Sequence, residues 1–145
     1  MCIRDSQKSG IPDDCIIELH GNSNYAKCLE CEKRFELLPL KTEFLAHGTL
    51  PTCDLCGGIV KTATVSFGQP MPTHAMESAD AAALACDLFI AIGSSLQVFP
   101  AASLPQVAKN AGAKLAIINN ESTNLDVLCD LVIHAQIGPT LSAVI

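Results

Sequence analysis

The amino-acid sequence predicts an α/β protein in which part of a parallel, doubly wound sheet with helices accompanies a small four-cysteine subdomain. Two observations predict this. The first half of the 145-residue chain holds two C-x2-C pairs, and from Thr73 onward the pattern alternates between helix and strand. In addition, residues 25–58 are polar and charge-bearing, whereas residues 81–145 are apolar. A core with a small metal-held insert fits this division better than one uniform domain.

The N-terminal region carries one strand signal. Residues 1–6 show no periodicity and are taken as an unmatched leader. The run Cys15-Ile16-Ile17-Glu18-Leu19 is short and β-branched, which favours a strand that ends at His20-Gly21.

The paired cysteines predict a zinc ribbon with Cys28, Cys31, Cys53 and Cys56 as ligands. Each C-x2-C pair turns two sulfurs toward one ion, and two pairs complete a tetrahedral site with Zn–S distances of ~2.3 Å. Because four thiolates leave no open coordination position, the metal stabilises the fold and catalysis at the cysteines is disfavoured. Two disulfides, or free thiols with this spacing by chance, are the alternatives. Gly57-Gly58 supplies a flexible turn after the second pair.

The second half alternates between helices and strands. Residues 63–67 form an extended stretch that is closed by Gly68 and two prolines. An alanine-lined helix follows over residues 75–86, and residues 88–92 form an apolar strand of the kind buried on both faces of a parallel sheet.

A helix is expected to start at Ser103, with Gln106 completing a capping box, and to stop at Gly112. Strands over residues 114–118 and 131–134 and a terminal helix from Pro139 complete the pattern. Ligands of such sheets bind beyond the carboxyl ends of the strands. Two of these ends carry Gly93-Ser94-Ser95 and Asn119-Asn120-Glu121.

Composition narrows the partners and the location. The net charge is −6, and the nine Lys and Arg residues are scattered thinly, which argues against a nucleic-acid partner. No apolar run approaches the ~18 residues of a membrane span, so we expect a soluble protein with no membrane partner. The other four of the eight cysteines sit singly, as core residues do in a reduced protein, and no secretory signal is present. A cytoplasmic location is therefore expected.

Several stretches resemble, in order, the sirtuins, the NAD-dependent protein deacylases. Glu18-Leu19-His20-Gly21 is similar to the catalytic L-H-G of that family, and the C-x2-C pairs follow at the right distance. Phe67-Gly68-Gln69 with Met71-Pro72 resembles F-G-E-x-L-P. Residues 93–102 resemble G-T-S-L-x-V-x-P-A-A, and residues 118–123 resemble I-N-x-E-x-T.

The resemblance implies the domain organisation. Residues 7–24 and 59–145 would form a partial Rossmann-like NAD-binding domain, and residues 25–58 would form its zinc-ribbon insert. The G-A-G-x-S phosphate loop and the T-Q-N-I-D segment of the family are not found in this sequence. The resemblance therefore implies only a C-terminal portion, with the N-terminal half of the family fold missing, and we expect this chain alone to be inactive.

The resemblance also implies roles for individual residues in transfer of an acyl group from lysine to ADP-ribose with release of nicotinamide. His20 would be the general base, a role that suits the ~6.5 pKa of an ordinary histidine. Val65, Phe67 and Gly68 would bind the acyl-lysine peptide or protein. The NAD-binding residues would be Gly93, Ser94, Ser95, Asn119 and Glu121.

Two positions depart from the family pattern. Gln69 replaces the usual acidic residue, and Lys61-Thr62-Ala63 replaces R-P-D, which affects the expected acyl-chain preference and peptide contacts. Each motif also has a plain structural interpretation: a locally bonded turn histidine, an ordinary core strand, or a common turn at a strand end. A non-catalytic binding module made of a zinc ribbon and half of a Rossmann-like domain is the alternative function.

Overall fold

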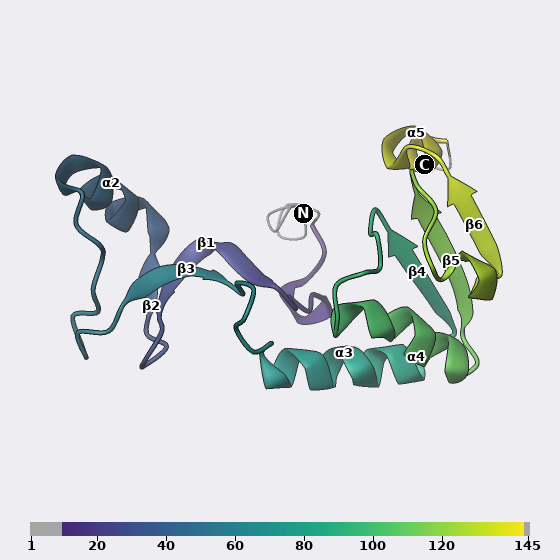
Figure 1. Cartoon of the computed structure of the whole chain (residues 1–145), viewed down its shortest axis with the longest axis horizontal. Helices are drawn as coiled ribbons and strands as arrows, with labels where there is room; N and C mark the ends of the chain where they lie inside the picture. Colours follow the sequence, from purple (N-terminus) through teal and green to yellow (C-terminus); the bar gives the residue numbers. More distant parts are fainter. Residues whose placement is uncertain (1–9, 144–145) are drawn as a thin grey trace. The chain divides into compact units, whose positions relative to one another are not determined.

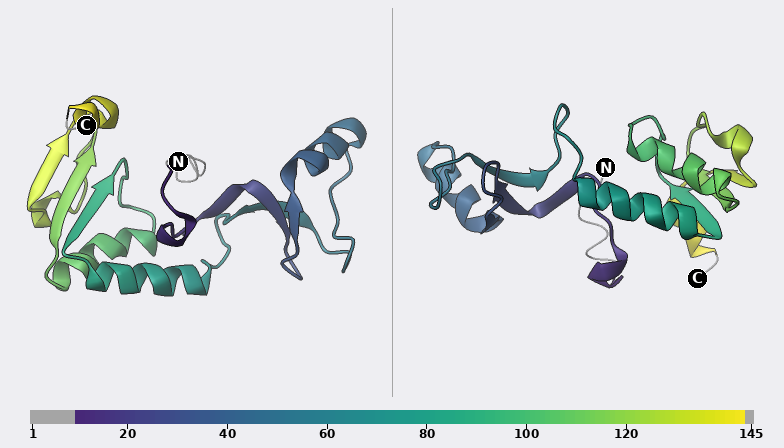
Figure 2. Two further views of the ribbon diagram at one scale, coloured as in Figure 1. Left: turned by 180° about the vertical axis from the view of Figure 1, so that it is seen from behind. Right: turned by 90° about the horizontal axis from the view of Figure 1, so that it is seen from below.

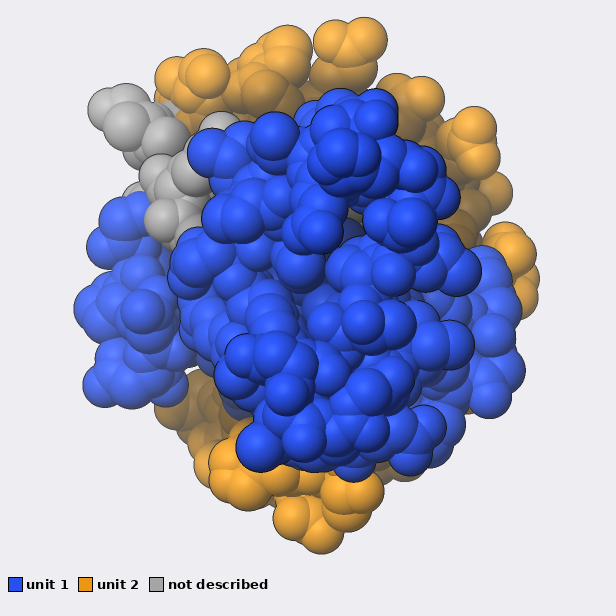
Figure 3. Space-filling model, turned by 90° about the vertical axis from the view of Figure 1, so that its left-hand side faces the viewer, with its two compact units in different colours: residues 1–72 blue, residues 73–145 orange. Residues whose placement is uncertain are grey.

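A computed structural model describes residues 10–143. The predicted leader, residues 1–6, lies outside the described residues. The chain divides into two compact units, with the boundary between Pro72 and Thr73 (Figure 3). The predicted insert, residues 25–58, lies inside the first unit, and its borders stay a prediction. Within residues 10–143, no helix combines the length and apolar character needed to cross a bilayer.

The first unit is built on a three-stranded antiparallel sheet with the order β2-β1-β3 (Figure 1). Its strands are β1 (Gly21–Cys28), β2 (Arg34–Glu36) and β3 (Val60–Thr64). The central strand β1 pairs with both neighbours, and its pairing with β3 is irregular between Gly21 and Ala26.

The strand predicted for Cys15–Leu19 is wrong. The structure has a short 3-10 helix, η1 (Asp13–Cys15), closed by a hydrogen bond from the Cys15 N–H to the Pro12 carbonyl, and no strand over residues 16–19. β-branched residues favour a strand only where a partner strand is available. In this chain the partner strands β2 and β3 pair with the segment that starts at Gly21.

A helix inside the cysteine-rich segment was missed by the sequence reasoning. Helix α2 (Leu37–His47) ends at Gly48, which adopts the left-handed conformation and donates its N–H to the Phe44 carbonyl. Leu37 and Leu40 pack against a buried cluster of Ala26, Cys28, Cys53 and Val60, together with Phe35. The segment therefore has a small apolar core that its polar composition conceals.

The second unit contains the predicted parallel sheet, with the strand order β4-β5-β6. Strands β4 (Leu88–Ile92), β5 (Lys114–Asn119) and β6 (Leu131–His134) match the three predicted strands within a residue. Helix α3 (Thr73–Ala85) and helix α4 (Leu104–Asn110) run side by side, and α4 packs on β4 and β5 (Figures 1 and 2). Short 3-10 helices precede α4 (η2, Ala101–Ser103) and β6 (η3, Asp126–Leu128), and helix α5 (Ile137–Ser142) starts two residues before the expected Pro139.

Burial in this sheet depends on the position of each strand. The central strand β5 buries four consecutive residues, including Leu115 and Ile117. On β4, by contrast, Leu88, Ile90 and Ile92 are exposed among the described residues. β4 pairs with β5 alone there, so the expectation of burial on both faces holds for β5 and not for β4.

The capping box predicted at Ser103 is absent. Ser103 belongs to η2 and has helical backbone angles, whereas a side-chain N-cap requires extended ones. Its hydroxyl donates to the Pro100 carbonyl instead, and the side chain of Gln106 donates to Asn110. Helix α4 nevertheless starts at the next residue, as expected.

Candidate functional site

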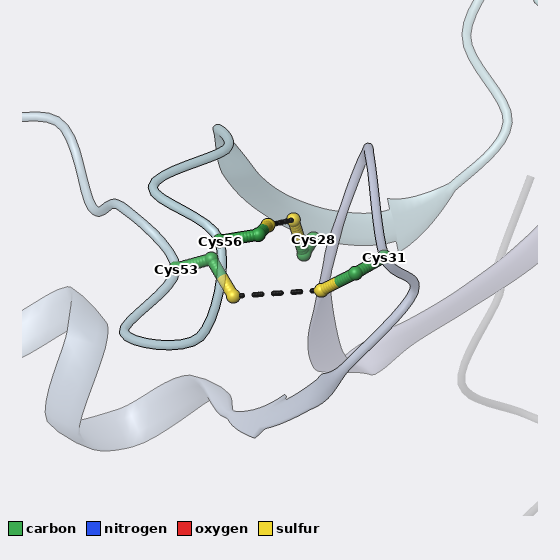
Figure 4. Close-up of side chains that lie close together, drawn as sticks. All are labelled: Cys28, Cys31, Cys53 and Cys56. Atoms are coloured by element: carbon green, nitrogen blue, oxygen red, sulfur yellow. Dashed lines mark hydrogen bonds between the residues drawn. The ribbon is translucent and has the colours of Figure 1, made fainter.

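Four cysteine sulfurs converge in the first unit (Figure 4). Cys28 ends β1, Cys31 lies in the following turn, and Cys53 and Cys56 lie in the loop before β3. The sulfurs are 3.4 Å apart for Cys28 and Cys56 and 3.6 Å apart for Cys31 and Cys53, and all four lie within 4.8 Å of one another. A disulfide would need ~2.05 Å, while two ligands of a tetrahedral zinc lie ~3.8 Å apart when Zn–S is ~2.3 Å. The cluster therefore fits a zinc site and not two disulfides.

The two cysteine turns have equivalent hydrogen bonds. The Glu30 N–H donates to the Cys28 sulfur and the Leu55 N–H to the Cys53 sulfur, each at 3.4 Å. Such bonds stabilise the negative charge of a thiolate. At Gly58 an added Cβ would lie 2.9 Å from the Cys28 sulfur, so a glycine there lets the loop approach the ligand closely.

The neighbouring sulfurs and backbone N–H groups shift the pKa values of these thiols in opposite directions. The backbone N–H of Cys31 is the main cause that lowers the pKa of Cys28 to about 7. At Cys56 the backbone N–H of Gly58 acts in the same direction, but the neighbouring sulfurs of Cys31 and Cys28 and burial outweigh it and raise the pKa to about 12. Four thiolates this close repel one another, and a bound dication removes that repulsion.

His20, the predicted general base, lies in a turn immediately before β1. Its carbonyl accepts the Val65 N–H at 2.9 Å. The following Gly21 has φ +75°, and an added Cβ would lie 2.0 Å from the Ala63 carbonyl oxygen. The glycine thus allows the His20 turn to lie directly against β3.

The predicted peptide-binding residues follow β3 in the same unit. Val65 continues the chain beyond the strand, and residues 66–69 form a turn in which the Gln69 N–H donates to the Ser66 carbonyl. Gly68 supplies φ +85° at the third position of this turn. The Phe67 side chain is 98 % exposed, so it is not part of a core strand within the first unit. The structure therefore brings His20 and the loop of Val65, Phe67 and Gly68 together.

The predicted cofactor residues lie in the second unit, at the carboxyl ends of two paired strands. Gly93 follows β4 and donates its N–H to the Ile118 carbonyl near the end of β5. It has φ +62°, and an added Cβ would lie 2.7 Å from the Ile137 side chain. Ser94 and Ser95 come next and are exposed, so their hydroxyls are accessible to a ligand.

Asn119 ends β5 beside this turn. Its side-chain amide donates to the Glu121 carbonyl at 2.9 Å, which shapes the Asn119–Glu121 corner. The Glu121 side chain is exposed. Hydroxyls, backbone amides and a carboxylate at one sheet edge are groups that fit a ribose and its phosphate, so the residues fit a nucleotide cofactor.

Comparisons with known proteins identify the family. Residues 5–100 match the Sir2 family. The chain belongs to the Sir2 family. An NAD-dependent protein deacetylase of Rhodopseudomonas palustris is 54 % identical over 135 residues, which is 93 % of this chain and 53 % of the relative. The chain thus spans about half the length of the curated relatives that it matches.

Solved Sir2 structures have the same fold. The structure of Sir2Tm bound to a propionylated peptide aligns with a TM-score of 0.87 and 31 % identity, over 95 % of this chain and 57 % of that one. A Sir2 complex with a p53 peptide and NAD+ aligns with a TM-score of 0.81 and 33 % identity, over 88 % of this chain and 53 % of that one. The predicted sirtuin resemblance and fold class are confirmed.

Two features of the structure were not predicted from the sequence. Lys61 and Gln69, singled out only as departures from the family pattern, contact each other. Of the singly spaced cysteines, which were expected to be small core residues, Cys15 is exposed and Cys86 and Cys129 are half-buried. Both findings depend on how the chain folds around these residues, which the neighbouring sequence does not reveal.

Proposed function

We propose that a full-length protein carrying this chain is an NAD-dependent protein lysine deacylase. It would transfer the acyl group from an acylated lysine of a peptide or protein to ADP-ribose and release nicotinamide. The observation that carries this proposal is the contact between the His20 turn and Val65, which places a histidine at the start of an exposed loop. A relative named as a deacetylase and a neighbour bound to a propionylated peptide support it.

The residues of this chain would divide the work. When bound, NAD supplies the ribose that accepts the acyl group. His20 would take a proton from a ribose hydroxyl at a ring nitrogen, as a general base does near neutral pH. Val65, Phe67 and Gly68 would hold the acyl-lysine segment. Gly93, Ser94 and Ser95, with Asn119 and Glu121, would hold the cofactor.

The zinc ribbon would have a structural role in this enzyme. Cys28, Cys31, Cys53 and Cys56 would fill all four positions of the metal and leave none for a substrate. A cytoplasmic location is also proposed, supported by the seven cysteines that the structure describes, none of which is in a disulfide.

His20→Ala in the full-length protein tests the proposed function. We expect deacylation of an acetyl-lysine peptide, measured as nicotinamide release, to fall by about 10²- to 10⁴-fold, because a general base acts in the transition state. NAD binding, measured by calorimetry, should persist. His47→Ala, which replaces the histidine at the last position of α2, is the matched control and should keep full turnover.

Two outcomes would contradict the proposed function. A His20→Ala variant with most of its turnover would remove His20 from the mechanism. A wild-type protein that binds acyl-lysine peptide without releasing nicotinamide would favour the non-catalytic binding module.

A further inference from the structure

One lysine holds the loop that follows β3. The Lys61 ammonium, on β3, donates to the Thr64 carbonyl, to the Ser66 hydroxyl at 3.2 Å and to the Gln69 side-chain oxygen at 2.9 Å. A lysine has three N–H donors, and all three are used within this loop. The ammonium is therefore occupied by its own chain and has no donor left for a ligand.

Gln69 closes the loop from the other end. Its side-chain oxygen also accepts the Ser66 N–H at 2.9 Å, and its own N–H donates to the Ser66 carbonyl at 3.0 Å. The tip between these two residues has no packing of its own, because Phe67 is almost fully exposed. The order of the tip therefore depends on these hydrogen bonds.

Among the residues that the structure describes, the Lys61 ammonium has no negatively charged partner. Across residues 10–143, no carboxylate forms an ion pair with Lys61, and its partners are neutral oxygens. Burial, and to a lesser degree the charge of Lys27 on the paired strand, lower the pKa of Lys61. Burying a charge without a counter-ion costs free energy unless hydrogen bonds compensate it. The three hydrogen bonds of the Lys61 ammonium supply that compensation, and they fix the positions of the loop atoms that accept them.

We propose that Lys61 and Gln69 form a clasp that positions the loop carrying Val65, Phe67 and Gly68 for the acyl-lysine peptide. Lys61 is a positioning residue that acts through the loop, and this inference rests on the proposed deacylase function. Both positions depart from the family pattern, in which an arginine and an acidic residue stand. Because the two side chains meet, the two departures lie at the two ends of one cation–amide contact.

Amide hydrogen exchange in this chain tests the clasp independently of any activity. In Lys61→Met we expect the Ser66 N–H to exchange about five- to tenfold faster, the effect of losing roughly one net hydrogen bond. Gln69→Leu removes the acceptor of the Ser66 N–H as well as the Lys61 contact, so it should raise the rate at least as much. The double variant should not exceed Gln69→Leu, because both changes break one contact. Gln69→Glu, which keeps the acceptor oxygens, should retain the protection.

Lys27→Met is the matched control. Lys27 on β1 is paired in register with Lys61, and its replacement removes the same charge. Its side chain forms an ion pair with Glu32 and makes no hydrogen bond to the loop after β3. Its Ser66 exchange should equal that of the wild type. If Lys61→Met loses its fold or its zinc, Gln69→Leu on the exposed loop provides the test through the N–H of residue 69, which donates to the Ser66 carbonyl and should also exchange faster.

Kinetics of the full-length protein test the role in peptide binding. Lys61→Met and Gln69→Leu should raise the KM for an acetyl-lysine peptide about five- to tenfold and leave kcat and the KM for NAD unchanged, since loop order affects binding of one substrate. Unchanged Ser66 exchange would overturn the clasp. Faster exchange with an unchanged peptide KM would overturn its role in positioning. A wild type without deacylase activity would overturn the proposed function and the peptide role with it, and the exchange rates would still report on the clasp.

Discussion

Gly21 shows at the scale of a single residue how closely the His20 turn is fitted to β3. Its φ of +75° lies in the left-handed region, and a side chain would meet the Ala63 carbonyl oxygen at 2.0 Å. Gly48, at the end of α2, has a similar φ of +68° but open space around its Cα. The two glycines therefore separate the effect of backbone conformation from that of steric contact.

Gly21→Ala is expected to lower the free energy of unfolding of the first unit by about 3 kcal/mol or more. The left-handed conformation costs about 1–2 kcal/mol for an L-residue, and displacement of the paired strand adds to it. Gly48→Ala should lower the same free energy by only about 1 kcal/mol. Urea unfolding of both variants checks this, and equal losses would show that the contact with Ala63 does not constrain the turn.

At the scale of elements, the Asp130 carboxylate ties three parts of the second unit together. It accepts hydrogen bonds from Lys109 on α4 at 2.6 Å and from Lys114 on β5 at 3.1 Å. Asp130 lies one residue before β6 begins, and it also accepts the backbone N–H of Leu115 at 2.8 Å. The Lys109 ammonium is the main cause that holds the pKa of Asp130 well below its usual range, with the Leu115 N–H next.

Asp130→Asn should destabilise the second unit and flatten its stability below pH 4. A depressed carboxyl pKa contributes stability above the unfolded-state value of about 3.9, and that contribution is lost as the pH falls toward the folded-state pKa. The wild type should therefore lose stability on acidification more steeply than Asp130→Asn. Thermal unfolding from pH 7 to pH 2 measures this, with Glu77→Gln on the exposed face of α3 as control. Parallel pH profiles for wild type and Asp130→Asn would contradict the prediction.

At the scale of the whole molecule, the two units depend on different sources of stability. The second unit buries Leu115 and Ile117 of its central strand and Ala108 of α4, which packs on the sheet. It also buries Ala79 and Ala83 of α3, which packs against α4. The first unit has a smaller cluster, and two of its buried members, Cys28 and Cys53, belong to the candidate metal site. Loss of a metal from the first unit would therefore disturb its apolar cluster directly.

The chain should hold one zinc, and its removal should unfold the segment from Tyr25 to Gly58 while the helices and strands of the second unit persist. Metal analysis with amide exchange before and after chelation measures both effects. Cys53→Ser should behave like the chelated protein. Cys15→Ser, at an exposed cysteine outside the cluster, is the matched control. A Cys53→Ser variant with full zinc content and unchanged thermal stability would refute a structural zinc.

Elements that carry their own periodic signal were predictable from the residues alone. The alanines of α3 repeat at helical spacing, and β5 is a continuous apolar run, so burial patterns within ten or so residues were sufficient. The spacing of the C-x2-C pairs and the ordered motifs likewise predicted the zinc cluster, and they predicted which residues lie at the strand ends.

Contacts between distant residues required the tertiary structure. Cys15–Leu19 has strand-forming residues, but pairing with β2 and β3 selects the segment from Gly21 instead. Ser103 has the right residue type for a cap, but the preceding 3-10 helix directs its hydroxyl to Pro100. The Lys61–Gln69 contact appears only when the loop after β3 folds back on its strand. In each case the outcome depends on which partner a group meets in space, and local sequence does not encode that partner.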